Sequence, residues 1–156
     1  MKIKFTLGEF AKFPYHLDNG DAGYDVYYAG RNHVSIQPGA RIKLDTNLSW
    51  EVVFDNLIEK ILFKLLHMSI YAHICDRSGL ALKKGITVLG GILDISFRGN
   101  IGVILLNVSQ EVVVIKPEDR IAQIIFSTCL HPTSIIKVDE LSKTSRGSGG
   151  FGSTGK

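Results

Sequence analysis

The sequence lacks most features that mark secreted, membrane-spanning or nucleic-acid-binding proteins. Its two cysteines, Cys75 and Cys129, are too few for a disulfide framework and form no C-x-x-C pair, so we expect buried free thiols. No uncharged apolar run reaches transmembrane length, and residues 1–5 contain no apolar signal core. Lys and Arg number 18 against 15 Asp and Glu, without a basic cluster, which disfavours nucleic acid as a partner. These absences predict an intracellular protein of the cytoplasm or nucleus that binds neither membrane nor nucleic acid.

The sequence does contain enough apolar residues for one continuous core. Its 156 residues are 45% hydrophobic and 21% charged, as in ordinary globular domains. Short segments of alternating or β-branched residues recur between Gly, Asn and Pro turns, a pattern typical of a β-sandwich or barrel. The expected strands are residues 2–7, 34–36, 41–44, 103–108, 112–115 and 121–126.

One segment, residues 54–68, has helical periodicity instead. Its apolar residues recur every three or four positions, its charged residues lie largely on the other face, and Asp55 could cap its start. Such a helix either packs on a sheet edge or barrel end, or binds a protein partner or another subunit. The mixed signs of its polar face disfavour a membrane surface. The apolar positions are Phe54, Leu57, Ile58, Ile61, Leu62, Leu65 and Met68.

Residues 145–156 are rich in glycine and hydroxyl side chains, around Arg146 and Phe151. Such a composition cannot form a core, so it predicts either a disordered end or a flexible flap. Its backbone N–H groups, guanidinium and aromatic ring would suit a flap over a phosphorylated ligand that contains a ring.

Four internal stretches carry the remaining candidates for chemistry, although each alone could be an ordinary turn or strand. Arg77 can bind phosphate in a bidentate manner, and Ser78 can donate a hydrogen bond beside it. Asp94 is a carboxylate next to a glycine pair, in what reads as a hairpin. Asp25 and Gln123 are polar in apolar strands, so they either bond internally or face a site. The stretches are residues 21–26, 76–81, 90–102 and 119–124.

In order, the stretches D-A-G-Y-D, D-R-S-G-L-A, G-G-I-L-D-I-S-F-R-G-N-I-G-V-I-L-L-N, D-R-I-A-Q and S-R-G-S-G-G-F-G-S-T-G resemble the five motifs of the trimeric dUTPase family. Their wording is most similar to the eukaryotic and poxvirus enzymes, so the source could be cellular or viral. The resemblance implies an all-β, distorted jelly-roll barrel over residues 1–144, with a helical insertion at 54–68 and a flap at 145–156. It also implies a homotrimer whose active sites are shared between subunits.

The same resemblance implies a reaction and its residues. The reaction is Mg²⁺-dependent hydrolysis of dUTP to dUMP and pyrophosphate, which limits uracil in DNA and supplies dUMP for thymidylate synthesis. Asp94 would be the general base that activates water for attack on the α-phosphorus, and Asp25 would hold Mg²⁺ through water. The implied substrate-binding residues are Arg77, Ser78, Gly79, Gln123 and Arg146 at the phosphates, Phe97 at the deoxyribose, Gly91 and Phe151 at the uracil, and Gly102 and Gly152.

Three positions within the motifs depart from the family pattern. Phe97 stands where the family usually has Tyr, which keeps the ring face and loses the phenol hydrogen bond. Ser96 replaces a second acid, which lowers the negative charge near Asp94. Asp76 replaces a common Pro, and we expect it to pair with Arg77 and weaken the grip of Arg77 on phosphate. The 54–68 insertion is a further departure.

Two other functions compete with this interpretation. The first is a dCTP deaminase, a related enzyme of another class, which needs a Glu beside the pyrimidine. Residues 90–107 contain no Glu, and the C-terminal flap favours the pyrophosphatase. The second is a non-enzymatic, dUTPase-like regulator whose 54–68 helix binds a protein partner.

Overall fold

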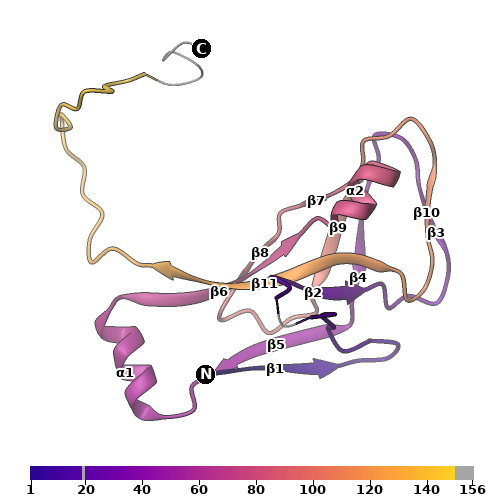
Figure 1. The fold of residues 1–156 in the computed structure, drawn as a ribbon, viewed down its shortest axis with the longest axis horizontal. Helices are drawn as coiled ribbons and strands as arrows, with labels where there is room; N and C mark the ends of the chain where they lie inside the picture. Colours follow the sequence, from indigo (N-terminus) through magenta and orange to yellow (C-terminus); the bar gives the residue numbers. More distant parts are fainter. Residues whose placement is uncertain (19, 150–156) are drawn as a thin grey trace.

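The computed structural model describes residues 1–18 and 20–149. Over these residues the chain forms eleven strands and two helices (Figure 1). In chain order they are β1 Lys2–Leu7, β2 Tyr24–Tyr27, β3 Val34–Ile36, β4 Arg41–Asp45, β5 Leu48–Val53, α1 Leu57–Leu65, β6 Met68–Cys75, α2 Ser78–Lys84, β7 Ile86–Leu89, β8 Ile92–Asp94, β9 Gly102–Asn107, β10 Val113–Ile115 and β11 Arg120–Leu130.

The strands pair antiparallel in four sheets, with orders β1-β5, β10-β3, β2-β11-β6-β8 and β4-β9-β7. All six strands predicted from the sequence are present; five differ by at most one residue at each end, and the predicted 121–126 strand extends four residues further, to Leu130. The predominantly β prediction is therefore confirmed. The expected barrel is not: over the described residues, these four sheets do not join into one closed ring of strands.

The inner faces of the sheets share one core, because the buried side chains come from strands of every sheet. Trp50 of β5 is 2% exposed, and its ring lies 5.5 Å from that of Phe126 of β11. Two buried polar residues are satisfied by backbone partners. Thr46 Oγ1 donates to the Ile101 carbonyl at 2.8 Å, and Asn107 Nδ2 donates to the Ile36 carbonyl at 2.9 Å. The core includes Val26 of β2, Ile74 of β6 and Ile124 of β11, so it packs these three strands together.

Helix α1 confirms the predicted helix but corrects its ends. Its cap is Asn56 rather than Asp55, and Asn56 Oδ1 accepts the Glu59 N–H at 2.9 Å. Asp55 instead pairs with Lys2 Nζ at 3.0 Å. At the other end, Met68 begins strand β6 rather than ending the helix, because it pairs with Leu130 of β11.

The apolar face of α1 points to solvent. Leu57, Ile58 and Leu65 are 70%, 77% and 70% exposed, and no residue of α1 is buried. The contacts of the helix are made by Phe63, whose ring lies 5.1 Å from that of Phe54, and by Glu59, which pairs with the Met1 ammonium group at 3.0 Å. The expectation that this face packs on a sheet edge is therefore wrong, and the interpretation as a contact surface for another chain remains.

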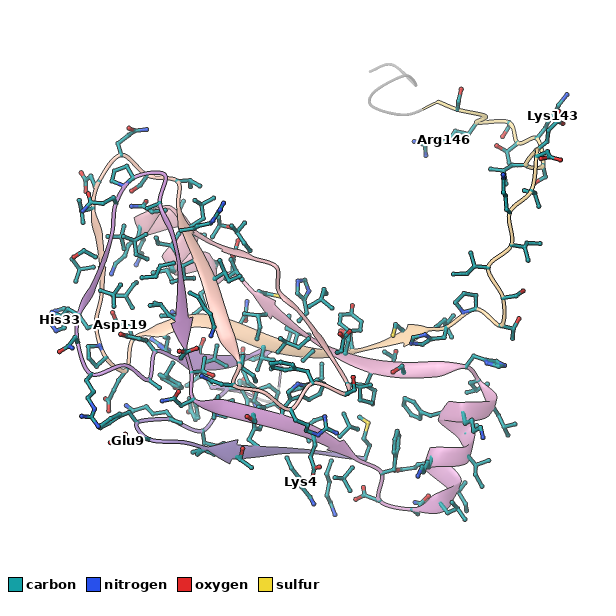
Figure 2. All side chains as sticks on the ribbon, turned by 180° about the vertical axis from the view of Figure 1, so that it is seen from behind. Lys4, Glu9, His33, Asp119, Lys143 and Arg146 are labelled. Carbon is teal, nitrogen blue, oxygen red and sulfur yellow. The ribbon has the colours of Figure 1, made fainter. Side chains whose placement is uncertain are left out.

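Beyond Leu130 the chain leaves the body of the protein, as Figures 1 and 2 both show. The segment starts beside α1, where His131 N–H donates to the His67 carbonyl at 2.7 Å. Its apolar side chains stay exposed, with Ile135 at 90% and Leu141 at 85%. The predicted boundary between domain and flap at 144 remains a proposal. Neither described helix has the length and apolarity that a membrane crossing requires.

Candidate active site

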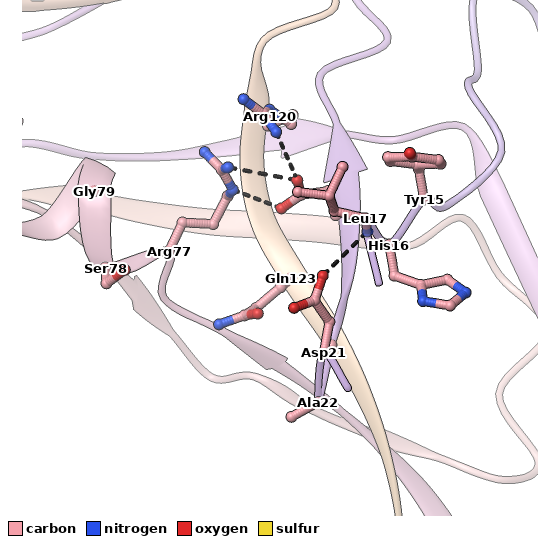
Figure 3. A pocket seen from close by; sticks show the side chains of 12 residues that line it. Tyr15, His16, Leu17, Asp21, Ala22, Arg77, Ser78, Gly79, Arg120 and Gln123 are labelled. Atoms are coloured by element: carbon pink, nitrogen blue, oxygen red, sulfur yellow. Dashed lines mark hydrogen bonds and ion pairs between the residues drawn. The ribbon is translucent and has the colours of Figure 1, made fainter. Parts of the chain in front are cut away.

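Three of the sequence stretches converge on one hollow of about 320 Å³ (Figure 3). Asp25 of β2 and Gln123 of β11 are register partners on neighbouring strands. Gln123 is also the register partner of Cys75, the last residue of β6, so the segment after β6 begins beside the hollow. This segment places Arg77 and Ser78 on the wall of the hollow. Two separate strand registers therefore assemble residues that lie far apart in the sequence.

Two arginines bind the carboxylate of Asp25. Arg77 Nε donates to Asp25 Oδ1 at 2.6 Å, and Arg120 NH1 donates to Oδ2 at 3.1 Å. The side chains of Asp25 and Arg77 are only 18% and 25% exposed, so these charges are partly desolvated. Asp21 also lines the hollow, so two guanidiniums face two carboxylates and their formal charges balance. Both guanidiniums nevertheless offer donors that bind phosphate oxygens well.

Arg120 was not singled out in the sequence. It lies within the 119–124 stretch, in which only Gln123 is a predicted site residue. Only the pairing of β11 with β2 brings it to Asp25, 95 residues away in the chain. The available signal is the adjacent Asp119-Arg120 pair at the point where β11 begins.

Asp76 does not pair with Arg77, and that expectation is wrong. Its carboxylate accepts hydrogen bonds from the Thr87 hydroxyl, at 2.9 Å, and from the Val88 N–H of β7. Its carbonyl accepts the Gln123 amide at 2.8 Å. Asp76 therefore anchors the loop before α2 and leaves Arg77 free to face Asp25. Burial, and then the nearby Asp76 carboxylate, raise the pKa of the Cys75 thiol, so Cys75 is a neutral thiol at pH 7.

Gly79 leaves the hollow open where α2 begins. A Cβ atom built at Gly79 would meet no described atom within 4 Å, so any larger side chain would project into free space. Gly79 borders this hollow and a second one beside it. The glycine thus lets a ligand approach the backbone beside Arg77 and Ser78.

The stretch around Asp94 lies elsewhere in the same chain. Asp94, at the end of β8, is exposed and opposite Tyr71 of β6, whereas Gln123 is opposite Cys75. Four strand residues separate Tyr71 from Cys75, which is about 13 Å. Within one chain, Asp94 therefore does not line the hollow that holds Asp25.

The predicted hairpin around Asp94 is not formed as expected. β8 pairs with β6, and β9, which begins at Gly102, pairs with β4 and β7. Gly91 is needed for packing, because a Cβ there would come within 2.1 Å of the Ile74 carbonyl oxygen. Phe97 is 39% exposed on the loop between the two strands. Its ring is thus available to a ligand or to another chain.

Arg146 lies on the C-terminal tail, apart from both the residues around Asp25 and those around Asp94. Its Nε donates to the Gly149 carbonyl at 2.9 Å, and Figure 2 shows it on the tail, away from the body that carries Asp119. Phe151 and Gly152 lie outside the described residues. The predicted site residues therefore fall into separate groups in one chain, of which the group around Asp25 is assembled.

The fold and the hollow describe a β protein that places two arginines, an amide and a hydroxyl where they can bind phosphate groups. The comparison with known families is more specific: the model of the dUTPase family matches residues 11–155. The chain therefore belongs to the dUTPase family, and the resemblance in its motifs is confirmed. The same match disfavours the alternative of a dCTP deaminase.

Individual relatives agree with this assignment. The chain is 40% identical to the deoxyuridine 5'-triphosphate nucleotidohydrolase of Nautilia profundicola, over 100% of both chains. It is also 40% identical to the vaccinia virus (strain Copenhagen) protein of that name, over 93% of this chain and 86% of the viral one. The solved dUTPase of Staphylococcus bacteriophage 80alpha, a G164S mutant with dUpNHpp, has a TM-score of 0.79 at 21% identity and covers 99% of each chain. At that identity the structural match shows the fold alone.

Proposed function

We propose that this chain hydrolyses dUTP to dUMP and pyrophosphate, and so limits uracil in DNA and supplies dUMP for thymidylate synthesis. The observation that carries the proposal is the convergence of Asp25, Arg77 and Gln123 on one hollow. These residues come from three of the five family motifs, and Ser78 and Gly79 adjoin them. Together with Arg120, which lines the same hollow, they offer two charged donors, an amide, a hydroxyl and open backbone to a phosphate chain.

The proposed active site is completed by other copies of the chain, in a homotrimer. The support is the spacing within one chain: Asp94 sits about 13 Å along β6 from the hollow. A general base must come within hydrogen-bond reach of the water it activates. A second copy would therefore bring its Asp94 to this hollow, and the tail of a further copy would supply Arg146 and Phe151.

In this site Asp94 accepts a proton from water as the water oxygen attacks the α-phosphorus. The bond from that phosphorus to the bridging oxygen breaks, and pyrophosphate leaves. Arg77, Ser78 and Gln123 bind the phosphates and stabilise the charge that develops on the leaving group. Arg146 from the tail adds a further positive charge, and closure of the tail excludes water.

Selection of the base and sugar falls to the stretch from Gly91 to Gly102. Backbone groups beside Gly91 would read uracil, and a cytosine would leave fixed donors unpaired because its 4-position is itself a donor. The Phe97 ring would cover the deoxyribose where a 2′-hydroxyl would clash. The close packing of Gly91 on Ile74 supports this role, since it holds that backbone rigidly.

Asp25 is the residue that would hold Mg²⁺ through water. No group of three or more His, Cys, Asp or Glu side chains among the described residues forms a metal cage. A single carboxylate on the wall of the hollow suits Mg²⁺, which keeps several waters and takes other oxygens from substrate phosphates. Arg77 and Arg120, which bond the two Asp25 oxygens in the structure, would then turn to the phosphates. When bound, the ion offsets negative charge on the phosphates.

Pyrophosphate release from a panel of deoxynucleoside triphosphates tests the proposed function. We expect dUTP to be hydrolysed at least about 10²-fold faster than dTTP or dCTP, because a methyl group clashes and cytosine leaves donors unpaired. Removing Mg²⁺ with a chelator should suppress the rate. Ammonia release from dCTP, or equal rates for all four substrates, would contradict the proposal.

The exposed face of α1 favours an additional role in binding another protein chain. Ile58 and Leu65 are more than two-thirds exposed on a helix with no buried residue, and an apolar patch of this kind marks a contact surface. We expect the double variant Ile58→Ser, Leu65→Ser to hydrolyse dUTP at the normal rate. A protein partner bound to the wild type, or larger assemblies seen by light scattering, should be lost. Unchanged association in this variant and in a 54–68 deletion would exclude the role.

A further inference from the structure

We infer that the chain carries a second anion-binding site, next to the candidate active site, that takes inorganic pyrophosphate on its way out. The site is a hollow of about 390 Å³ along α2, lined from Gly79 in the first turn to Lys83 and Lys84 in the last. Four cationic side chains line it, and two of them also line the first hollow. They are Arg77, Lys83, Lys84 and Arg120. Only the identity of the anion rests on the proposed function.

The lysines of this hollow are not neutralised by the protein. Lys83 and Lys84 are exposed in the last turn of α2 and form no ion pair with any described residue. Lys2, Lys4, Lys12 and Lys43 each lie within 3.5 Å of a carboxylate oxygen, whereas Lys116 and Lys143 form no ion pair with a described residue. What distinguishes Lys83 and Lys84 is that they line a concave site together with two arginines. Uncompensated positive charge in a concave site is the arrangement that attracts a small anion.

The acids near the hollow do not cancel this charge. Asp119 lines the hollow, but its Oδ2 already accepts the Lys116 N–H at 2.8 Å. Asp25 faces the first hollow and is shared by two arginines. Four cations against these two carboxylates leave an excess of two positive charges. A pyrophosphate, with several negative charges on a short chain, matches this excess better than a single carboxylate does.

The two hollows share Arg77, Gly79 and Arg120, so they cannot act independently. Both guanidiniums hold Asp25 in the structure, and each could instead face an anion on the Lys83 side. Gly79 borders both hollows and has no side chain that would stand between them. A leaving pyrophosphate could therefore move from the first hollow to the second while remaining bound to the same arginines.

The test is titration of inorganic pyrophosphate into the full-length protein by calorimetry at low salt, without nucleotide. We compare the wild type with the double variant Lys83→Gln, Lys84→Gln. The matched control is Lys60→Gln, Lys64→Gln, which removes two unpaired exposed lysines from α1. We expect the α2 variant to weaken pyrophosphate binding roughly tenfold, the control to bind normally, and Lys83→Arg, Lys84→Arg to restore binding.

Steady-state kinetics separates this inference from the proposed function. In the α2 variant, inhibition of dUTP hydrolysis by added pyrophosphate should weaken by a similar factor, while KM for dUTP changes less than about twofold. Normal pyrophosphate binding by the α2 variant, or an equal loss in the control, would overturn the inference. So would a large rise in KM for dUTP, because the lysines would then belong to the substrate site. A wild type that binds pyrophosphate through these lysines but hydrolyses no dUTP would contradict the proposed function alone.

Discussion

The Asp94→Asn variant is expected to hydrolyse dUTP at least about 10²-fold more slowly than the wild type. Asparagine keeps the shape of the side chain but cannot accept a proton from water, and general-base catalysis typically contributes 10²–10⁴-fold. Asp94 is exposed at the end of β8, and its side chain forms no hydrogen bond or ion pair with a described residue. The fold should therefore not depend on this carboxylate. We expect the free energy of unfolding to change by less than about 0.5 kcal/mol.

Three measurements check this variant: the rate of pyrophosphate release, dUTP affinity by calorimetry, and assembly state by light scattering. Only the rate should change. Asp139→Asn is the matched control, since Asp139 is an exposed acid on the tail outside the motifs. Turnover by Asp94→Asn within a few-fold of the wild type would remove Asp94 from the mechanism.

A chain that ends at Ser145 is expected to lose most of its turnover and none of its stability. The last strand ends at Leu130, and residues 131–148 are exposed, so the deletion removes no described buried side chain. What it does remove is Arg146 and the ring of Phe151. Loss of a donor that stabilises developing charge lowers turnover by about 10²–10³-fold, and loss of closure adds to this.

Thermal unfolding and kcat measured on the same samples test this prediction. The single variant Arg146→Gln should reproduce part of the kinetic loss, whereas Lys143→Gln, which removes an exposed cation just before the motif, should be neutral. If the truncated chain keeps full activity, the tail is not a flap. If it unfolds at a clearly lower temperature, the tail contributes to packing that one chain does not contain.

Much of the fold could be predicted because local periodicity reports on burial. β1 was predicted correctly, since its side chains alternate between faces with a period of two. α1 was predicted because its apolar residues recur with a helical period, but that same period carried the expected helix on to Met68. α2 was missed because Ser78-Gly79 reads as a turn, and seven residues give little periodic signal.

The direction of the apolar face of α1 could not be predicted, for a related reason. Periodicity shows that Leu57, Ile61 and Leu65 share a face, but it does not say what the face meets. In the structure Phe63 anchors the helix to Phe54, and the wider apolar face is left to solvent. The pattern is the same whether the partner is the sheet or another chain.

For the candidate site, the sequence alone determined the family and the types of chemical group available. The order of five short motifs was enough for both, because motif residues and their spacing are read along the chain. Only the tertiary structure decided which groups meet. Arg120 reaches Asp25 across 95 residues through the register of β11 on β2, and Asp76 turns to β7 instead of Arg77. Contacts of this kind depend on strand register and backbone hydrogen bonds between distant segments, which no local pattern contains.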